Sequence, residues 1–576
     1  MKITLVRKIS QGFFFLLFIW LIIVNTIGES LWQIRGWPVN FFLNIDPLTA
    51  LTTALSTHSL YKGLIWSVII IIGTILLGRF FCSWLCPFGT LHNMVSWLGH
   101  RNKKVSDKIE LNKYRKTHSI KYIVLILFLI MAAIPFSSRT VQIGLLDPIP
   151  LFTRSVSIVL LPIIDSAHHV TSAVTRYYEG ALIILALFIT LTLLNLFIPR
   201  FFCRFLCPLG ALFGILSRFA IFRIGHNENK CHHCDVCEKH CQGGCEPGKE
   251  IRQSECLLCF NCREDCLHDT INFQNEKSQG GEITGPQISR KAFVITLGSG
   301  IFLAPAVRLS GMLESNWQYN ILRPPGSCKE EEFLRRCIKC GQCMRICPTN
   351  IIQPGKLLKG IENLWTPELN FQVGSSGCQY NCTACGQVCP TGAIRPISLN
   401  EKHGLKKFKK QGPIRMGTAF FDRNRCLPWA KKIPCIVCQE NCPVSPKAIY
   451  TDESFDEIRD GSYRVLSIKN KTIELVKSNL KPETLGSGDY YIFKGTESFK
   501  IKSNSQSSVT INKNSTIKNG DAISIKVKLQ RPYMDIEKCI GCGICQHECP
   551  VGGLKAVRIS AEGESRDPKK KMLLKR

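Results

Sequence analysis

The sequence lacks the signatures of several common protein classes. Its 576 residues contain no nucleic-acid-binding motif, no nucleophile motif and no hydride-carrier motif, and the lone Gly-x-Gly at residues 298–300 is too short for a nucleotide fingerprint. Acidic residues are few, 43 against 73 Lys and Arg, which gives a net charge of +30. Because this excess lies mainly beside apolar segments and along the C-terminal half, we interpret it as a determinant of membrane topology rather than as a nucleic-acid surface.

Cysteine, by contrast, is abundant, with 30 residues. Most of them fall into six groups with short internal spacings, which is typical of metal-ligand sets and not of a disulfide scaffold. A chain of this length exceeds a single hydrophobic core, and roughly two to four domains are expected. The composition therefore predicts a multidomain protein with several metal centres.

Four apolar segments predict an α-helical transmembrane bundle: residues 9–28, 64–77, 122–136 and 181–198. The first follows Lys2, Arg7 and Lys8, as in a signal peptide, but no small-residue cleavage site comes after it, so we expect it to be retained. The apolar run 156–164 is too short to span a membrane and contains Pro162, which predicts an interrupted interfacial or re-entrant helix.

Loop charges predict the orientation of this bundle. The loop 79–119 carries eight Lys and Arg residues, whereas the loops 29–59 and 137–179 carry one and three. The positive-inside rule then places both ends of the four-helix unit in the cytoplasm. We therefore predict a multi-pass protein of the bacterial cytoplasmic (inner) membrane.

The membrane region is an internal duplication. The stretch from Phe81 to Gly89 contains a Cys-x3-Cys-Pro motif that recurs from Phe202 to Gly210, and an Asp-Pro pair precedes each copy. By pseudo-symmetry the four motif cysteines can converge on one redox or metal site. The alternative is that each pair forms a structural turn or a redox-active dithiol. The four cysteines are Cys82, Cys86, Cys203 and Cys207.

The first soluble cysteine region has the tandem spacing of bacterial two-cluster ferredoxins. In that pattern three thiolates hold one [4Fe-4S] cluster, and the fourth cysteine of each group ligates the other cluster. The expected ligands are Cys231, Cys234 and Cys237 with Cys266, and Cys256, Cys259 and Cys262 with Cys241. A zinc site is the weaker alternative. Cys245 is a spare thiol that could replace Cys241.

Four further groups follow in the C-terminal half, and in each the last cysteine precedes a proline. We expect neighbouring groups to pair, the first with the second and the third with the fourth, and to exchange their last cysteines. Gly341, Gly386 and Gly543 are expected in tight turns around cluster sulfurs. Cys328 is left over and is expected to be no ligand. The sixteen candidate ligands are Cys337, Cys340, Cys343, Cys347, Cys378, Cys382, Cys385, Cys389, Cys426, Cys435, Cys438, Cys442, Cys539, Cys542, Cys545 and Cys549.

Between the last two groups lies a segment without cysteine. Ile523, Ile525, Val527 and Leu529 alternate with polar residues, which predicts a strand. Asn519-Gly520 and Asp460-Gly461 are hairpin-turn signals. We therefore expect a small inserted β domain, which either docks a partner or shields the clusters.

The predicted fold class is multidomain: a transmembrane bundle of four helices plus a fifth, α+β ferredoxin-like [4Fe-4S] domains and the inserted β domain. The predicted domains are a membrane domain (1–225), a cytoplasmic two-cluster module (226–285), a membrane anchor (289–310), the first part of a four-cluster domain (311–450), the β domain (451–530), the last cluster motif (531–565) and a basic tail (566–576).

These motifs resemble those of known ferredoxin-type families. The two Cys-x3-Cys-Pro motifs and the paired clusters behind them resemble the membrane proteins NapH and, more distantly, NosR. The part from about residue 289 resembles NapG and MauM, which carry four clusters. The chain thus looks like a NapH–NapG fusion, although these two parts are normally separate chains.

The resemblance implies a quinol dehydrogenase-type electron-transfer component. It would oxidise (mena)quinol and relay electrons through six [4Fe-4S] clusters to a periplasmic reductase or cytochrome. Quinol oxidation releases protons, so a carboxylate or imidazole near the membrane surface is required, and Asp46, Asp147 and His58 are the candidates. An Asp before Pro, however, more commonly caps a helix. The rival functions are the supply of electrons for maturation or regulation of a metalloenzyme, as implied for NosR-like proteins, and a cytoplasmic accessory in electron bifurcation or thiol reduction.

The segment 289–310 decides on which side the C-terminal half works. Its start, Ser289-Arg290-Lys291, resembles a twin-arginine export signal, and the resemblance to NapG implies export of a folded, cluster-loaded domain. We expect residues 289–310 to remain as a fifth membrane helix. Cleavage near Ala304-Pro305-Ala306 and a cytoplasmic core helix are the alternatives.

Overall fold

Two compact units make up the computed structural model of the chain, which describes residues 2–27, 38–133, 141–168, 175–312, 321–567 and 570. The first unit comprises Met1–Asn370 and Asn381–Ile414, and the second comprises Phe371–Tyr380 and Arg415–Arg576. Most of the predicted basic tail lies outside the described residues. The two units are described separately.

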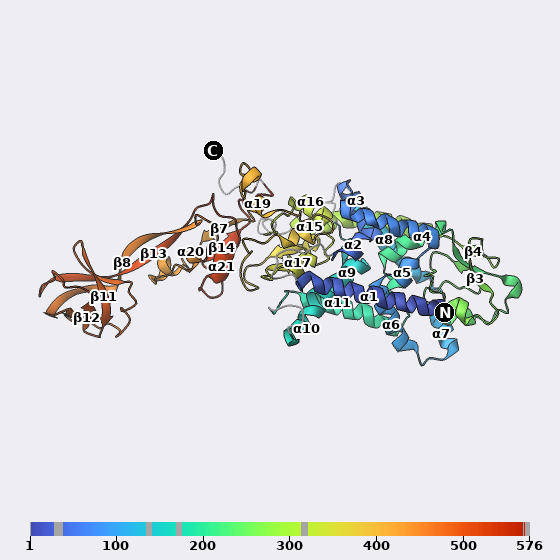
Figure 1. Cartoon of the computed structure of the whole chain (residues 1–576), viewed down its shortest axis with the longest axis horizontal. Helices are drawn as coiled ribbons and strands as arrows, with labels where there is room; N and C mark the ends of the chain where they lie inside the picture. Colours follow the sequence, from blue (N-terminus) through green and yellow to red (C-terminus); the bar gives the residue numbers. More distant parts are fainter. Residues whose placement is uncertain are drawn as a thin grey trace. The chain divides into compact units, whose positions relative to one another are not determined.

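Long apolar helices form the centre of the first unit (Figure 1). α1 (Ile3–Ile27) has no charged residue after Lys8. At 1.5 Å per residue its 25 residues extend about 37 Å, more than the roughly 30 Å of a bilayer's hydrocarbon core. By length and composition, three described segments can cross a membrane: Ile3–Asn25, Lys116–Ala133 and Pro148–Ser166. Shorter apolar helices, Lys62–Leu77 and Ala181–Leu196, cover the other two predicted spans.

The helical bundle repeats one order of elements twice. The first copy consists of α3 (Pro47–Thr57), α4 (Ser67–Leu77), α5 (Phe80–Trp84) and α6 (Pro87–His100). The second consists of α9 (Pro148–Ser155), α11 (Ala181–Leu193), α12 (Phe201–Phe205) and α13 (Pro208–Leu216). Every Asp-Pro and Cys-Pro pair of the repeat opens a helix, because Pro suits the first helical position and the preceding side chain caps the free N–H groups.

The segment after α9 corrects one prediction. Pro162 does not interrupt the helix, because α9 continues through a π-helical turn, Val156–Leu160, into α10 (Leu161–His168). The widened turn already changes the backbone hydrogen-bond pattern at the point where Pro162 cannot donate. Most of this segment is buried inside the protein, as expected for a core or re-entrant helix.

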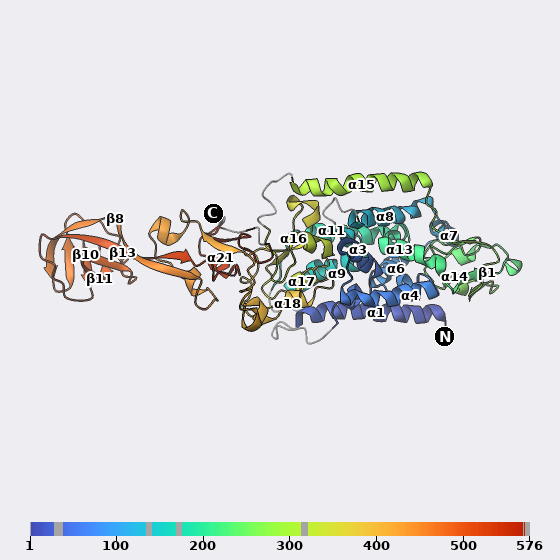
Figure 2. The same ribbon diagram turned by 90° about the horizontal axis from the view of Figure 1, so that it is seen from above.

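α15 (Arg290–Met312) lies beside α8 (Ile120–Ala133) along the bundle (Figure 2). Its 23 residues extend about 34 Å, which is enough to span the hydrocarbon core. Gly300 allows the close approach, since a Cβ at this position would lie 2.9 Å from Ile130 Cδ1. Small residues let helices pack closely, so Gly300 explains how α15 packs against α8.

The first cysteine region folds as a small module with two short sheets. β1 (Arg223–His226) pairs antiparallel with β3 (Ile271–Gln274), and β2 (Ile251–Arg252) pairs parallel with β4 (Glu282–Ile283). α14 (Asn261–Asp265) contacts β3. Cysteine side chains form much of the core of this module.

The second cysteine region of this unit contains three short helices and one strand pair. They are α16 (Glu330–Arg336), α17 (Gln342–Ile346), α18 (Ala384–Gln387) and the antiparallel strands β5 (Ile352–Pro354) and β6 (Pro367–Leu369). α17 contacts both α18 and the C-terminal part of α1.

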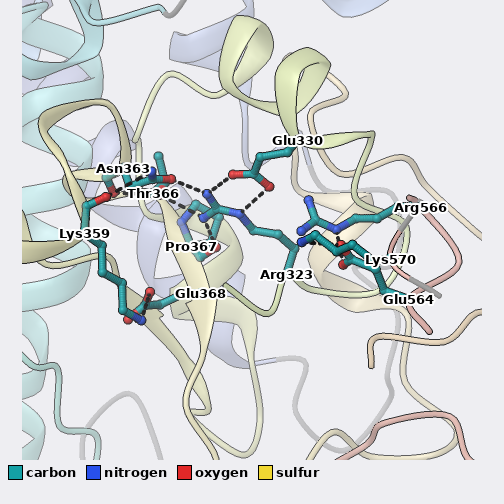
Figure 3. A network of polar contacts seen from close by, with 10 residues as sticks. All are labelled: Arg323, Glu330, Lys359, Asn363, Thr366, Pro367, Glu368, Glu564, Arg566 and Lys570. Carbon is teal, nitrogen blue, oxygen red and sulfur yellow. Dashed lines mark hydrogen bonds and ion pairs between the residues drawn. The ribbon is translucent and has the colours of Figure 1, made fainter. Parts of the chain in front are cut away.

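A buried arginine joins these elements (Figure 3). Arg323 pairs with Glu330 of α16 at 2.5 Å, and its guanidinium lies 4.5 Å from the ring centroid of Phe333. It also donates hydrogen bonds to Asn363, Thr366 and the carbonyl oxygen of Pro367. A buried charge is tolerated only when it is paired and hydrogen-bonded, and this network meets both conditions. Figure 3 also draws an ion-pair group of the second unit, in which Glu564 binds Arg566 and Lys570.

The second unit combines a small cysteine-rich region with a β-barrel. The strands β7 (Thr418–Phe421) and β14 (Val557–Ser560) pair antiparallel, and α20 (Val437–Glu440) contacts α21 (Ile544–Glu548). Six strands close into the barrel in the order β10-β11-β12-β9-β8-β13. They are β8 (Ile449–Lys469), β9 (Thr472–Leu475), β10 (Tyr490–Lys494), β11 (Glu497–Asn504), β12 (Ser508–Ile511) and β13 (Ala522–Met534).

The barrel matches one sequence signal and corrects two. Ile523, Ile525, Val527 and Leu529 are all buried on β13, as their alternation predicts. Asp460-Gly461 is no hairpin turn: it lies within β8 at a register shift against β13, where extra residues form a bulge. Asn519-Gly520 does turn the chain, but it joins no paired strands, because β12 pairs with β9 and β11 rather than with β13.

Candidate iron–sulfur sites

A repeated backbone turn shapes the cysteine groups. In Cys337-x2-Cys340 the residues on both sides of the second cysteine, Lys339 and Gly341, have positive φ. The same pair of positive φ angles flanks the second cysteine in the groups that start at Cys231, Cys256 and Cys539. This turn aims backbone N–H groups at sulfur: Lys339 donates to Cys337, and Gln342 donates to Cys340. Concave arrangements of backbone N–H groups favour an anionic centre.

The glycine predictions hold for two of three positions. Gly341 and Gly543 have positive φ, as expected for a tight turn. Gly386 does not; it lies within α18, and a Cβ there would meet the carbonyl oxygen of Arg395 at 2.3 Å. Gly386 is therefore required by a close backbone approach rather than by its own conformation.

The first set of thiols lies in the module after the bundle. Cys231, Cys234, Cys237 and Cys266 line a common hollow, so the last cysteine does cross to the other group. Cys234 is exposed and Cys231 is half-buried, which makes this the more accessible set of the module.

The second set consists of Cys256, Cys259, Cys262 and Cys241, which all lie within electrostatic range of one another. Cys245 Sγ lies 3.4 Å from Cys241 Sγ. The hydrogen bond from Cys245 lowers the pKa of the Cys241 thiol to about 6 and raises the pKa of Cys245. Cys245 thus lies against the second set and also hydrogen-bonds Cys256, and its place as the spare thiol or as a ligand instead of Cys241 stays a prediction.

Three further sets line hollows of their own. Cys337, Cys340 and Cys343 come together with Cys389 in the first unit. In the second unit one hollow is lined by Cys426, Cys435, Cys438 and Cys549, and another by Cys539, Cys542, Cys545 and Cys442. The expected exchange of last cysteines between neighbouring groups is thus seen in these three sets.

The remaining set would combine Cys347, Cys382 and Cys385 of the first unit with Cys378, which belongs to the second. The Cys378 N–H donates to the carbonyl oxygen of Cys542 at 2.7 Å. This ligand set stays a prediction. Cys328 is buried, and its Sγ lies 3.5 Å from the carbonyl oxygen of Gly392; that it is no ligand stays a prediction.

The chemistry of these sets fits cubane clusters. Burial raises the pKa of Cys337 to about 11 and that of Cys340 to about 12, although backbone donors oppose the shift. Buried thiols of this kind ionise when a metal centre replaces the proton. Among the residues that the structure describes, no three His, Cys, Asp or Glu side chains are arranged for a single metal ion.

The four cysteines of the bundle converge. Cys86 and Cys207 each lie within electrostatic range of Cys82 and Cys203. Cys86 and Cys207 also cap α6 and α13, since their sulfurs accept the N–H groups of Gly89 at 3.3 Å and of Gly210 at 3.2 Å. The turn role is thus present in both motifs, and the shared site stays a prediction that this proximity allows.

Charged residues that the sequence analysis missed connect these thiols to the second set. Glu255, next to Cys256, lies 3.7 Å from Arg79, forms a short ion pair with Lys121 and accepts a hydrogen bond from Tyr122. The Arg200 guanidinium donates to the carbonyl oxygen of Cys82. The repeat itself carries the signal, because Arg-Phe-Phe-Cys occurs at 79–82 and again at 200–203.

The predicted quinone residues do not form one site. Asp46 and Asp147 are fully buried and in contact with each other. Two buried carboxyl groups in contact cannot both be ionised, so they share a proton. His58 lies at the opposite end of α3 from Asp46, 11 helical residues away. Asp46 and Asp147 also cap α3 and α9, as their Asp-Pro context predicts.

Comparisons with family models agree with the iron–sulfur assignment. A model described as a 4Fe-4S binding domain matches residues 60–106 and 181–225, which contain the four bundle cysteines. A 4Fe-4S dicluster domain matches residues 336–393, and a further 4Fe-4S binding domain matches residues 530–551. No solved structure shows a significant match to the chain.

Known relatives share part of the chain. An uncharacterised protein of Methanocaldococcus jannaschii is 28% identical over 274 residues, 47% of this chain and 87% of its own length. The ferredoxin-type protein NapH of Escherichia coli is 26% identical over 253 residues, covering 41% of this chain and 77% of NapH. The regulatory protein NosR of Stutzerimonas stutzeri is 26% identical over 185 residues, 32% of this chain and 22% of NosR. The predicted likeness to membrane ferredoxin-type proteins of the NapH and NosR kind is confirmed.

Proposed function

We propose that the chain oxidises a quinol, (mena)quinol in the first instance, and relays the electrons to a reductase or cytochrome outside the cytoplasm. The coarser assignment rests on the comparisons, since the similar proteins are iron–sulfur electron-transfer proteins of the membrane. What we propose beyond this assignment is the electron donor, the electron acceptor and the direction of transfer across the membrane.

The observation that best supports this proposal is that the two ends of α1 contact different cysteine regions. Near its start, the Thr4 hydroxyl donates to Glu264 of the first module at 2.6 Å. Near its end, the Asn25 amide donates to Gln342 of the second cysteine region at 2.7 Å. The 21 residues between these contacts rise about 32 Å, which is close to the thickness of the hydrocarbon core. If α1 spans the membrane, the two cysteine regions of the first unit lie on opposite sides of it.

The thiols described above would hold [4Fe-4S] clusters. Such clusters carry one electron at a time with little rearrangement, and hydrogen bonds to sulfur and burial tune their potentials. The chain's own residues supply the turn amides, the buried environment and the nearby charges. Arg7 is within electrostatic range of Cys259, and a positive charge beside a centre favours its reduced form.

The four bundle thiols are the proposed link between the two sides. One continuous apolar core contains Cys82, Cys86 and Cys207 together with Cys340 of the far region. Arg79, Lys121 and Glu255 connect the same thiols to Cys256 on the near side. The bundle thiols therefore lie between Cys256 and Cys340, where electrons would have to pass from one cysteine region to the other.

The regulatory function is the second candidate, because one of the similar proteins is the regulatory protein NosR. A maturation role would use the same clusters to reduce a metalloenzyme during its assembly. Loss of the chain would then leave the reductase incompletely assembled, whereas a respiratory role leaves it assembled but without electrons.

Topology labelling tests the proposal. Single cysteines cannot serve as reporters in this chain, so a protease site would be placed at Gly285, before α15, and another at Gly412 near the end of the first unit. Added protease should cleave only the second site in intact spheroplasts and both sites after lysis. Protection of both sites contradicts outward relay.

Iron and sulfide analysis should give about 24 iron atoms per chain, four for each of six centres.

A further inference from the structure

A wide cavity lies where the bundle meets the first cysteine module. It has a volume of about 730 Å³ and lies between α1, α6, α7 (Val105–Asn112) and the module. Sites for small molecules typically measure about 300–1,000 Å³. None of the residues predicted for the quinone site lines it.

The cavity borders the second thiol set. Its lining includes Gln242, which follows Cys241, and Asn261, which lies between Cys259 and Cys262. A molecule bound here would therefore sit beside the loops that hold this set.

A chain of amide side chains forms one wall. Arg7 donates to Gln242 at 3.2 Å and to Asn261 at 3.1 Å. Gln242 donates to Asn93 at 2.6 Å, and Asn93 in turn points its amide to Gln11 at 3.5 Å. Arg7 is only 2% exposed, and its Nε–H has no acceptor among the residues that the structure describes. The two amide oxygens of Gln242 and Asn261 thus hold the guanidinium in place at the cavity wall.

Apolar side chains form another wall. Met94, Trp97 and Leu98 of α6 line the cavity and are each more than half exposed. α6 lies in the charged loop between two predicted spans, and Trp favours the level of the lipid headgroups, so this exposed apolar face suits the membrane interface. The cavity thus offers hydrogen-bonding groups beside the redox centre and an apolar route toward the bilayer.

We propose that this cavity binds the quinol, a proposal that rests on the proposed function and gives it a location. The two-hydroxyl ring matches the wall of Arg7, Gln242 and Asn93, and the isoprenoid tail matches Trp97 and its neighbours. Oxidation of one quinol to the quinone breaks two O–H bonds. The oxidant would be the [4Fe-4S] cluster held by the second thiol set, which would accept the two electrons one at a time and pass each on before the next. The two protons pass to water at the open cavity.

A phospholipid is the competing occupant. Lys8, Arg101 and Lys108 also line the cavity and could bind a phosphate group. The wall beside the redox centre, however, consists of half-buried neutral amides around one buried arginine, and the carboxylates of Glu264 and Asp265 also line the cavity and would repel a phosphate. These features favour the quinol.

The test uses the full-length, iron-loaded chain in phosphatidylcholine nanodiscs with a short-chain naphthoquinol. Gly12 of α1 lines the cavity, and a Cβ there meets nothing within 4 Å, so Gly12→Phe fills the cavity without a backbone clash. Gly298→Phe is the matched control, because Gly298 is also a helical glycine with open space and lies outside the cavity. Reduction by dithionite checks that both variants retain their centres.

We expect Gly12→Phe to lower kcat/KM for quinol-driven reduction by about tenfold or more, with Gly298→Phe unchanged. In the wild type, an azido-naphthoquinone should photolabel α1 and α6, and excess naphthoquinol should prevent the labelling. If the wild-type centres are not reduced by quinol at all, the proposed function fails. If they are reduced but both variants react equally and the label maps to α3 and α9, only the location is wrong. The proposed location is also wrong if the probe does not label α1 and α6 and the purified chain retains only phospholipid.

Discussion

Single residues control how each thiol set is built. Lys339 and Leu258 adopt positive φ although they are not glycines, a conformation that costs about 1–3 kcal/mol each. The N–H groups that this turn directs at sulfur compensate for the cost once an anionic centre is bound. Where the sequence has glycine in the same place, as at Gly541 and Gly543, the turn forms without that strain.

Gly543→Ala should damage the thiol set of Cys442, Cys539, Cys542 and Cys545. Gly543 has φ +74°, and a Cβ would lie 2.2 Å from the Phe371 ring. We expect the substitution to lower the free energy of unfolding of the second unit by about 2 kcal/mol or more and to reduce its iron content. Gly552→Ala is the control, since its Cβ meets nothing within 4 Å. Thermal unfolding and iron analysis measure both effects; equal stability of the two variants would contradict the expectation.

Cys241 and Cys245 should differ sharply when each is replaced by serine. Cys241→Ser removes a proposed ligand and should cost about four iron atoms per chain, the content of one cubane. Cys245→Ser alters the hydrogen bonds to Cys241 and Cys256 and should retain all iron while shifting the reduction potential of that centre, because hydrogen bonds to sulfur tune it. Iron analysis and redox titration of both variants distinguish the two roles. If Cys245→Ser loses the iron and Cys241→Ser retains it, Cys245 is the ligand.

At the scale of elements, the Asp-Pro and Cys-Pro pairs explain the architecture of the bundle. Each pair starts a short helix whose first turn is capped by the residue before proline. Because the pairs recur in both repeats, the helix starts bring two carboxyl groups together and four thiols together. The long helices α1, α8 and α15 provide the outer frame.

The packing of α15 on α8 can be weakened at one position. Gly300→Leu should lower the midpoint of thermal unfolding in detergent, because its Cβ would meet Ile130 Cδ1 at 2.9 Å, and overpacking costs about 1–3 kcal/mol. Gly298→Leu, on the same helix with open space, is the control. If both variants unfold at the same temperature as the wild type, α15 is not held by this contact.

At the scale of the molecule, the barrel is distinct from the parts of the chain that carry the cysteines. The barrel has its own apolar core, and β8 and β13 lead to it as a long strand pair. Five of the six predicted cluster sets lie wholly within one unit or the other. The barrel contributes no cysteine.

Removal of the barrel should therefore leave the clusters intact. Glu457 and Lys526 face each other across β8 and β13, so an Asn-Gly turn can replace residues 458–525 and reconnect the strands. We expect an unchanged iron content per chain and unchanged reduction by quinol, with loss restricted to delivery to the acceptor if the barrel docks it. A loss of about four or eight iron atoms would instead assign the barrel a role in cluster assembly.

Local spacing was enough to predict much of the candidate site. The cysteine ligand groups, the exchange of Cys266, Cys389 and Cys549 between groups, and the duplicated helix starts all follow from short motifs, because covalent spacing fixes which sulfurs can wrap one cubane. Alternation likewise predicted β13.

Only the tertiary structure decided what depends on distant contacts. It separated His58 from the Asp46–Asp147 pair, because a helix of 11 residues intervenes. It paired Glu255 with Arg79 and Lys121, and it opened the cavity beside Arg7, since both arise where segments more than 100 residues apart meet. Spacing along the chain carries no information about such encounters; the packing of the bundle against the cysteine module creates them.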